Sequence, residues 1–144
     1  MSQAVSAEKL IGYFQKDEFA RFIGCEITDA GEGWAKVRME IRPHHLNGVG
    51  ILHGGAIFTV ADLAGAVAAN SHGNVAVGIS CTVTYMKPPK GKSIIATARE
   101  ISRSRRIGHY DIDIVDGDSG EAIAAFQGTA FFTNKDLTYF DTRT

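Results

Sequence analysis

Apolar and charged residues alternate along residues 34–41, where alanine, valine, methionine and isoleucine share one register and lysine, arginine and glutamate the other. A repeat of two residues places the apolar side chains on one face, so this stretch predicts a half-buried antiparallel β-strand. Similar patterns predict strands at residues 25–29, 75–86, 93–101, 107–115 and 121–132. Residues 6–23 instead predict one or two short amphipathic helices, and residues 135–144 a polar C-terminal tail.

The longest apolar segment, GGAIFTVADLAGAVAAN at residues 54–70, has the length and composition of a buried helix. This is the only predicted helix that lies between predicted strands in the sequence, so repeated β-α-β winding is absent. We therefore expect an α+β fold in which an antiparallel sheet wraps around one long central helix, within a single domain at residues 1–144. The helix is apolar nearly all round, and one sheet face cannot cover it, so its other side is expected to meet a second subunit.

Composition narrows the classes of partner. The formal net charge of −1 over 144 residues gives no overall basic field for nucleic acid. The longest apolar segment contains an aspartate and many small residues, which makes a poor membrane span. The two cysteines show no metal spacing, and we expect buried free thiols. The sequence thus predicts a cytoplasmic protein that binds neither nucleic acid nor membrane.

Asp62 is the one formally charged side chain between Arg42 and Lys87. A carboxylate on a buried helix costs several kcal/mol unless it is paired, hydrogen-bonded or protonated. Burial raises the pKa of such a group and suits it to act as a general base or a nucleophile. The structural alternative is a buried aspartate that bonds a nearby hydroxyl, and Thr59 is one such partner.

Gly54 and Gly55 open the predicted helix, directly after His53. The first N–H groups of a helix lack partners and carry partial positive charge, so they can bind a developing oxyanion. A tight loop-to-helix turn explains the glycines equally. Asp62 follows Gly54 by eight residues, about 12 Å along a helix, whereas one reacting carbonyl must lie about 3 Å from both groups. We infer a composite site in which two antiparallel helices across a dimer axis each supply one of them.

Asn47 and His53 are the remaining catalytic candidates. The Asn47 amide can donate to a carbonyl or hold a water molecule, and His53 can orient the loop or the substrate. The histidines show no convincing metal spacing with Asp62, so no metal site is expected. The sequence also lacks a G-x-S-x-G nucleophile elbow, a phosphate loop and a dinucleotide fingerprint.

Together these residues resemble the hotdog-fold acyl-CoA thioesterases, in particular the PaaI-type (phenylacetate-degradation) branch. The resemblance covers residues 19–132 and is carried by Asn47, LHGG at residues 52–55, Asp62 and CTVTYMKP at residues 81–88. It implies dimers with a continuous sheet, usually assembled into tetramers. It also implies that the Gly54 N–H polarises the thioester carbonyl while Asp62 of the partner subunit attacks or activates water. Asn47 would position the carbonyl or the water, and His53 would support the loop.

The resemblance implies no metal or redox cofactor, and an acyl-CoA as the substrate. Related enzymes often carry a serine or threonine on the third long strand to hold the water, where this chain has Gly78, with Ser80 close by. The expected substrate contacts are Gly55, Phe58, Tyr85, Lys90, Arg105 and Arg106, the last three facing the phosphates of coenzyme A. An aryl, phenylacetyl-type group and a medium-chain acyl group remain open alternatives.

Two other functions remain open on the same fold. One is a non-catalytic module that binds acyl-CoA. The other, ranked lowest, is an enoyl-thioester hydratase, because such enzymes combine an acid with a histidine five residues later, where this chain has Val67.

Overall fold

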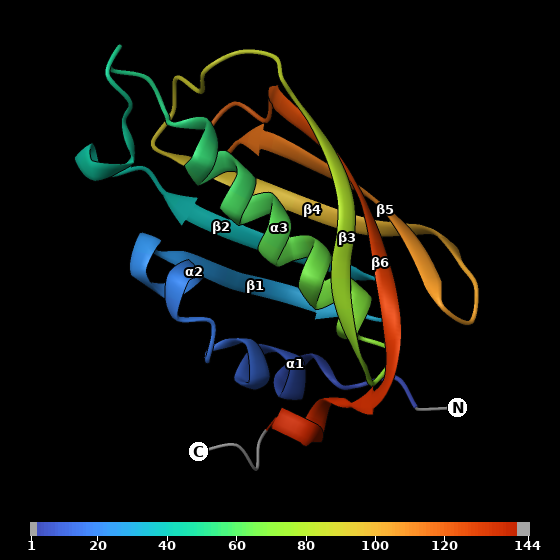
Figure 1. Cartoon of the computed structure of the whole chain (residues 1–144). Coiled ribbons are helices and arrows are strands. Elements are labelled where there is room, and N and C mark those ends of the chain that lie inside the picture. Colours follow the sequence, from blue (N-terminus) through green and yellow to red (C-terminus); the bar gives the residue numbers. More distant parts are fainter. Residues whose placement is uncertain (1–2, 141–144) are drawn as a thin grey trace.

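Residues 3–140, the part of the chain that the computed structural model describes, form one antiparallel sheet of six strands in the order β1-β2-β4-β5-β6-β3. The sheet curls around a single long helix, α3, and two short helices precede it (Figure 1). The predicted sheet around a central helix is therefore confirmed. The elements are α1 Ala7–Phe14, α2 Glu18–Ile23, β1 Cys25–Gly31, β2 Trp34–Glu40, η1 Pro43–His45, α3 Gly54–Asn70, β3 Asn74–Tyr85, β4 Ser93–Arg103, β5 Ile107–Asp116, β6 Ala122–Asp136 and η2 Leu137–Phe140.

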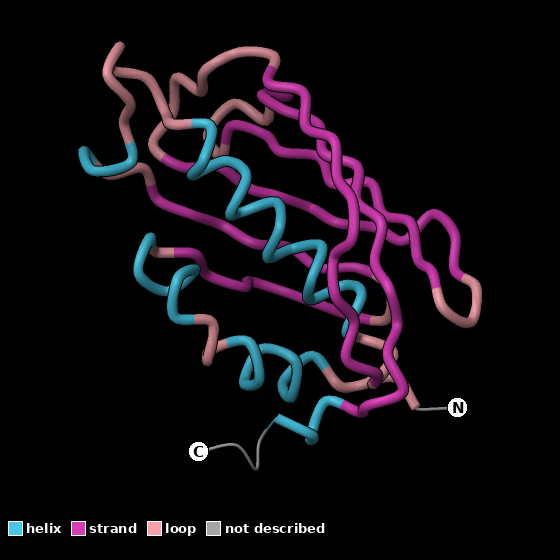
Figure 2. Tube along the Cα trace, viewed as in Figure 1, coloured by secondary structure: helices cyan, strands magenta, loops and turns pink. Residues whose placement is uncertain are grey.

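The alternating strands bury the face that their pattern predicts. In β2, Ala35, Val37 and Met39 are fully buried, and the charged residues between them are not. In β5, Ile112 and Ile114 turn inward in the same way. These side chains pack against α3, which contacts every strand of the sheet. Figure 2 shows α3 lying across the strands. Burial of each large apolar side chain contributes about 1.5–3 kcal/mol, so this layer holds the helix in place.

The N-terminal segment folds as two helices with defined ends. The hydroxyl of Ser6 caps α1, and the carboxylate of Asp17 accepts from the Ala20 N–H at 3.0 Å to cap α2. Gly24 ends α2 in the left-handed region at φ 89°, where a glycine is favoured.

One stripe of α3 faces away from the sheet. Its residues are small or polar, and Asp62 is exposed within the described chain instead of buried as the apolar composition predicts. Composition misleads here because alanine and glycine occur both in a protein core and in a surface stripe against which another helix can pack closely. Within residues 3–140, none of the helices combines the length and apolar character needed to cross a bilayer.

Strand β6 extends four residues past its predicted end at residue 132 and enters the segment expected to be a polar tail. The Thr133 hydroxyl donates to the Val75 carbonyl at 2.7 Å, and Asn74 Nδ2 donates to the Thr133 carbonyl at 3.0 Å. Leu137 then lies buried at 7% exposure. Polar side chains join this end of β6 to β3, which hydrophobicity alone does not reveal. Residues 141–144 of the expected tail lie outside the described residues.

Candidate functional site

The N-terminus of α3 presents one backbone N–H group that has no partner. A helix leaves its first four N–H groups, here those of residues 53–56, unbonded internally. The His53 N–H donates to the His45 carbonyl at 2.8 Å, the Gly55 N–H to His53 Nδ1 at 2.8 Å, and the Ala56 N–H to the His53 carbonyl at 3.0 Å. Among the described residues, the Gly54 N–H is left without an acceptor. It is therefore the donor that this positive helix end offers to a ligand.

Asn47 organises the loop that leads into α3. Its Oδ1 accepts from the backbone N–H groups of Val49 at 3.0 Å and Ile51 at 3.3 Å, and its own N–H donates to the Ile51 carbonyl. Gly50 turns this loop at φ 82°, a left-handed value that suits glycine. Because Oδ1 is engaged in the loop, the side-chain NH₂ is the group that Asn47 can direct at a carbonyl or a water molecule.

Tyr85, at the end of β3, lies over the start of α3. Its hydroxyl donates to the Gly54 carbonyl at 3.1 Å. A Cβ atom on Gly54 would lie 3.1 Å from the tyrosine ring carbon Cζ, so glycine leaves the space that this ring occupies. Tyr85, predicted as a substrate contact, therefore lies beside Gly54 at the start of the helix.

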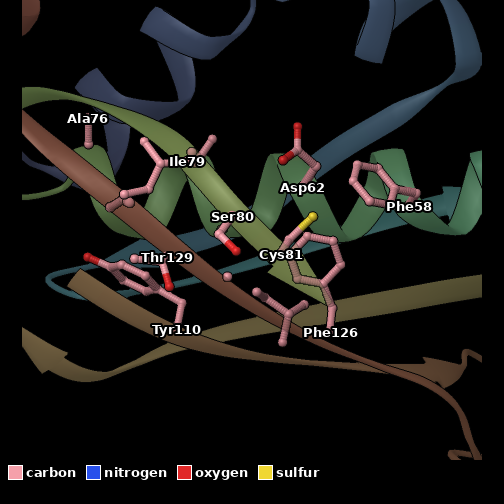
Figure 3. Close-up of a pocket in the computed structure, with 16 residues that line it drawn as sticks. Phe58, Asp62, Ala76, Ile79, Ser80, Cys81, Tyr110, Phe126 and Thr129 are labelled. Atoms are coloured by element: carbon pink, nitrogen blue, oxygen red, sulfur yellow. The ribbon is translucent and has the colours of Figure 1, made fainter. Parts of the chain in front are cut away.

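A cavity of about 330 Å³ lies beside Asp62, between α3 and strands β3, β5 and β6. Figure 3 shows Phe58 and Phe126 toward one end, Tyr110 toward the other, and Asp62 between them. The rings of Phe58 and Phe126 meet edge to face with centroids 5.2 Å apart. The cavity thus brings together two predicted site residues, Asp62 and Phe58, with a mainly apolar wall that suits an acyl group.

Asp62 has no hydrogen-bond or ion-pair partner within residues 3–140. The Thr59 hydroxyl donates instead to the Gly55 carbonyl at 2.8 Å, so the structural alternative of an Asp62–Thr59 bond is not realised. Partial burial raises the pKa of Asp62 above the ordinary carboxyl value, and the nearby carboxylate of Asp17 adds to the rise. An unpaired carboxylate with a raised pKa beside a cavity is suited to proton abstraction or nucleophilic attack.

The predicted site residues fall into two groups within one protomer. Asn47, His53, Gly54, Gly55 and Tyr85 gather at the N-terminus of α3. The others line the cavity further along the helix, where Gly78 and Ser80 of β3 join Asp62 and Phe58. About 12 Å separates Gly54 from Asp62 along the helix axis, so one protomer does not bring the two groups to a single reacting atom.

The predicted basic contacts flank opposite ends of α3. Lys90 borders a hollow that includes Leu46 and Leu52 of the loop before the helix. Arg105 and Arg106 lie in the β4–β5 turn and border a separate hollow with His72, which follows the C-terminal end of the helix. Arg106 Nη1 also donates to Asn134 Oδ1 at 2.8 Å, which holds this side chain to β6. Within one protomer these cations do not converge on one ligand.

Sequence reasoning did not single out a buried polar network at the C-terminal end of α3. The Tyr110 hydroxyl donates to Glu100 Oε1 at 2.8 Å, and His72 Nε2 lies 2.8 Å from the same oxygen. One signal was available: Glu100 shares the inward register of β4 with Ile94, Ala96 and Ala98, so alternation alone places a carboxylate on the buried face. The cysteine expectation also needs correction, because Cys25 is half-buried and Cys81 is exposed on β3 at the cavity.

Known proteins resemble this chain over most of its length. A model of the thioesterase superfamily matches residues 49–123. A putative esterase of Archaeoglobus fulgidus is 36% identical over 125 residues, covering 86% of this chain and 80% of the relative. The acyl-coenzyme A thioesterase PaaI of Escherichia coli K12 is 36% identical over 116 residues, covering 80% of this chain and 82% of that protein.

Solved structures show the same fold. The E. coli PaaI structure matches with a TM-score of 0.82 at 32% identity, covering 87% of this chain and 91% of that chain. A Streptococcus mutans protein solved with acetyl CoA matches with a TM-score of 0.74 at 25% identity, covering 80% of this chain and 93% of that chain. Sequence and architecture agree, and the chain belongs to the thioesterase superfamily, with the hotdog fold.

Proposed function

We propose that this thioester hydrolase cleaves acyl-CoA at a site shared by two protomers of a homodimer, with Asp62 from one protomer and the Gly54 N–H from the other. Membership of the superfamily and the E. coli relative named as an acyl-coenzyme A thioesterase support the reaction. The S. mutans relative, solved with acetyl CoA, supports the substrate class. The acyl-CoA is the sole small molecule that the reaction needs besides water.

One observation carries the shared site. Gly54 offers an unpartnered donor and Asp62 an unpartnered carboxylate within the described residues, yet about 12 Å of helix separates them. A second, antiparallel α3 laid against the open stripe of small residues brings Gly54 of each chain to Asp62 of the other. Strand β3 supports this arrangement, because it pairs with β6 on one side and forms an edge of the sheet on the other. Two such edges pair into a continuous sheet, and two dimers then form the expected tetramer.

The chemistry follows from these two groups. The Gly54 N–H hydrogen-bonds the thioester oxygen and stabilises the negative charge that develops on it. Asp62 either takes a proton from the attacking water or attacks the carbonyl carbon itself, forming an anhydride that water then hydrolyses. The carbon–sulfur bond breaks, and coenzyme A leaves as a thiolate that takes up a proton. The Asn47 amide is placed to orient the carbonyl or the water, and His53 holds the loop.

The phosphates of coenzyme A need cations at the mouth of the site. Lys90 lies near the N-terminal end of α3, on the side where Gly54 would bind the thioester. Arg105 and Arg106 lie at the other end of the same protomer. In a dimer of antiparallel helices, opposite ends of the two chains come together, so Lys90 of one protomer and the arginines of its partner can border the same mouth.

The test compares thiol release by the wild type and Asp62→Asn over a panel of aryl- and alkyl-CoA thioesters. We expect a loss of 10²- to 10⁴-fold in kcat/KM, the range for a general base, with an unchanged circular dichroism spectrum. Asp113→Asn is the matched control, because this exposed carboxylate is paired with Arg99 on the outer sheet face and should leave the rate unchanged. Retention of the full rate in Asp62→Asn refutes the mechanism. Binding of acyl-CoA by the wild type without thiol release would make the chain a binding protein.

Heavy-oxygen labelling separates the two roles of Asp62. Label found in the Asp62 carboxylate after a single turnover in H₂¹⁸O identifies the side chain as the nucleophile, because water has then opened the anhydride at the aspartyl carbonyl. A general base leaves the Asp62 carboxylate unlabelled, and all of the label enters the released acid. Mass spectrometry of the peptide containing Asp62 reads out the difference.

A further inference from the structure

Tyr110 closes one end of the cavity beside Asp62. Its side chain is 2% exposed and points from β5 toward the C-terminal end of α3. The hydroxyl donates to Glu100 Oε1 at 2.8 Å, and His72 Nε2 lies 2.8 Å from the same oxygen. Three elements therefore hold the tyrosine ring in one position: β4 through Glu100, β5 through the backbone of Tyr110, and the turn after α3 through His72.

A second, larger hollow of about 1050 Å³ lies behind this ring. His72 and Phe132 line the second hollow, whereas Tyr110 lines the first. A Cβ atom on Gly108 would lie 2.8 Å from both Phe132 Cζ and Tyr110 Cε2, so the two rings pack next to each other over that glycine. The His72 and Phe132 rings have centroids 6.0 Å apart. The wall between the two hollows is thus two side chains thick, with Tyr110 on the side of the cavity and His72 and Phe132 on the other side.

The distance from Asp62 to this wall limits what the cavity holds. Asp62 and Ala69 both line it, and they lie seven residues apart, about 10 Å along the helix. An extended chain advances about 1.2 Å per bond, judged from the span of about 3.6 Å over three backbone bonds. An acyl group whose carbonyl lies at Asp62 therefore meets the wall after about eight bonds.

We propose that Tyr110, held in place by Glu100 and His72, is the specificity-determining residue that sets the longest acyl group the site accepts. This inference rests on the proposed function, because it places the thioester carbonyl at Asp62. The ring forms the back wall of the acyl site. Its removal deepens the acyl site as far as His72 and Phe132 and so admits longer chains.

The experiment measures kcat/KM for straight-chain acyl-CoA thioesters from four to sixteen carbons, and binding of the same series to Asp62→Asn by calorimetry. Beyond about eight carbons we expect kcat/KM of the wild type and the affinity of Asp62→Asn each to fall tenfold or more, since even one misplaced methylene costs about 10- to 200-fold in a closed pocket. In Tyr110→Ala we expect the ratio of the twelve-carbon to the eight-carbon rate to rise at least tenfold. Tyr110→Leu keeps more of the buried volume and replaces Tyr110→Ala if that variant does not fold.

Ile112→Ala is the matched control. This residue follows two positions later on β5, is 1% exposed and lines the same cavity, but it is not one of the rings that meet over Gly108 at the wall. We expect its length limit to stay at the wild-type value although the core is loosened. A wild type without a length limit, an unmoved limit in the Tyr110 variants, or an equal shift in Ile112→Ala each overturns the inference. A length limit in binding without hydrolysis of any thioester overturns the proposed reaction but still supports Tyr110 as the residue that limits acyl length.

Discussion

A mixture of two inactive variants should regain activity if each site draws Gly54 and Asp62 from different chains. The first variant, Asp62→Asn, removes the carboxylate. The second, Gly54→Pro, removes the N–H donor. Proline fits there because it is favoured at the first helical position, and because His53 already has the extended backbone, φ −65° and ψ 135°, that a following proline requires. The tight contacts of the new Cβ atom are all with Tyr85, 3.1 Å from its Cζ, and Tyr85 is half exposed and able to shift.

The expected recovery follows from counting. When the two variants are co-expressed in equal amounts, half of the dimers contain one chain of each kind. In such a dimer one site joins Asp62 of the proline variant to Gly54 of the asparagine variant, and the other site lacks both groups. One intact site per mixed dimer gives about a quarter of the wild-type activity per protomer, whereas each variant alone gives about 1% or less.

The reverse mixture distinguishes shared sites from sites confined to one chain. Co-expression of the wild type with a chain that carries both substitutions makes mixed dimers without an intact shared site, so about a quarter of the activity remains. Sites confined to one chain would instead leave about a half, and they would give no recovery in the first mixture. Thiol release at equal total protein separates these values. No recovery in the first mixture, with both variants dimeric, refutes the shared site.

Three further predictions concern pH and stability. Partial burial and the carboxylate of Asp17 raise the pKa of Asp62. Activity is lost as pH falls through that pKa, so the acid limb of kcat/KM should lie at higher pH than for an ordinary carboxyl. A limb at the ordinary value contradicts this. Asn70→Ala leaves the part-buried N–H and carbonyl of Ala76 without the partner that lies at 2.9 and 3.3 Å. The free energy of unfolding in urea should therefore fall by about 1–3 kcal/mol, and a loss under about 0.5 kcal/mol contradicts this. Backbone N–H groups of Gly91 and of nearby residues lower the pKa of Asp116 to about 2. The difference in the free energy of unfolding between wild type and Asp116→Asn should therefore be largest above about pH 4 and shrink as pH falls toward about 2. A difference independent of pH contradicts this.

Local patterning was sufficient to predict the elements of this fold. The helix predicted at residues 54–70 is α3, and the alternation at residues 34–41 differs from β2 by one residue. Strand β1 runs two residues beyond its predicted end, because Ala30 pairs with Ala35 and is buried. The order of strands was not predictable in the same way. The pairing of β3 with β6 joins residues far apart in the chain, and apolar alternation is equally compatible with several neighbours.

The residues of the candidate site were also predictable only in part. Gly54 was identifiable because an unpartnered N–H follows from helix geometry alone, and Asp62 because no other charge is near it in sequence. Their surroundings depend on tertiary packing. Exposure of Asp62 in a single chain reflects which stripe of α3 the sheet leaves open. The position of Tyr110 depends on a hydrogen bond to Glu100, a residue of another strand.

The position of β6 between β5 and β3 has a consequence for synthesis on the ribosome. Strand β3 is complete at residue 85, but its one partner in the sheet begins at residue 122. At about 5–20 residues per second, the nascent chain carries this twelve-residue apolar strand without a partner for about 2–8 s. During that interval neither edge of β3 is protected, and neighbouring ribosomes on one messenger hold several such strands close together. The last strand to emerge thus ends the period in which this protein is most prone to aggregate.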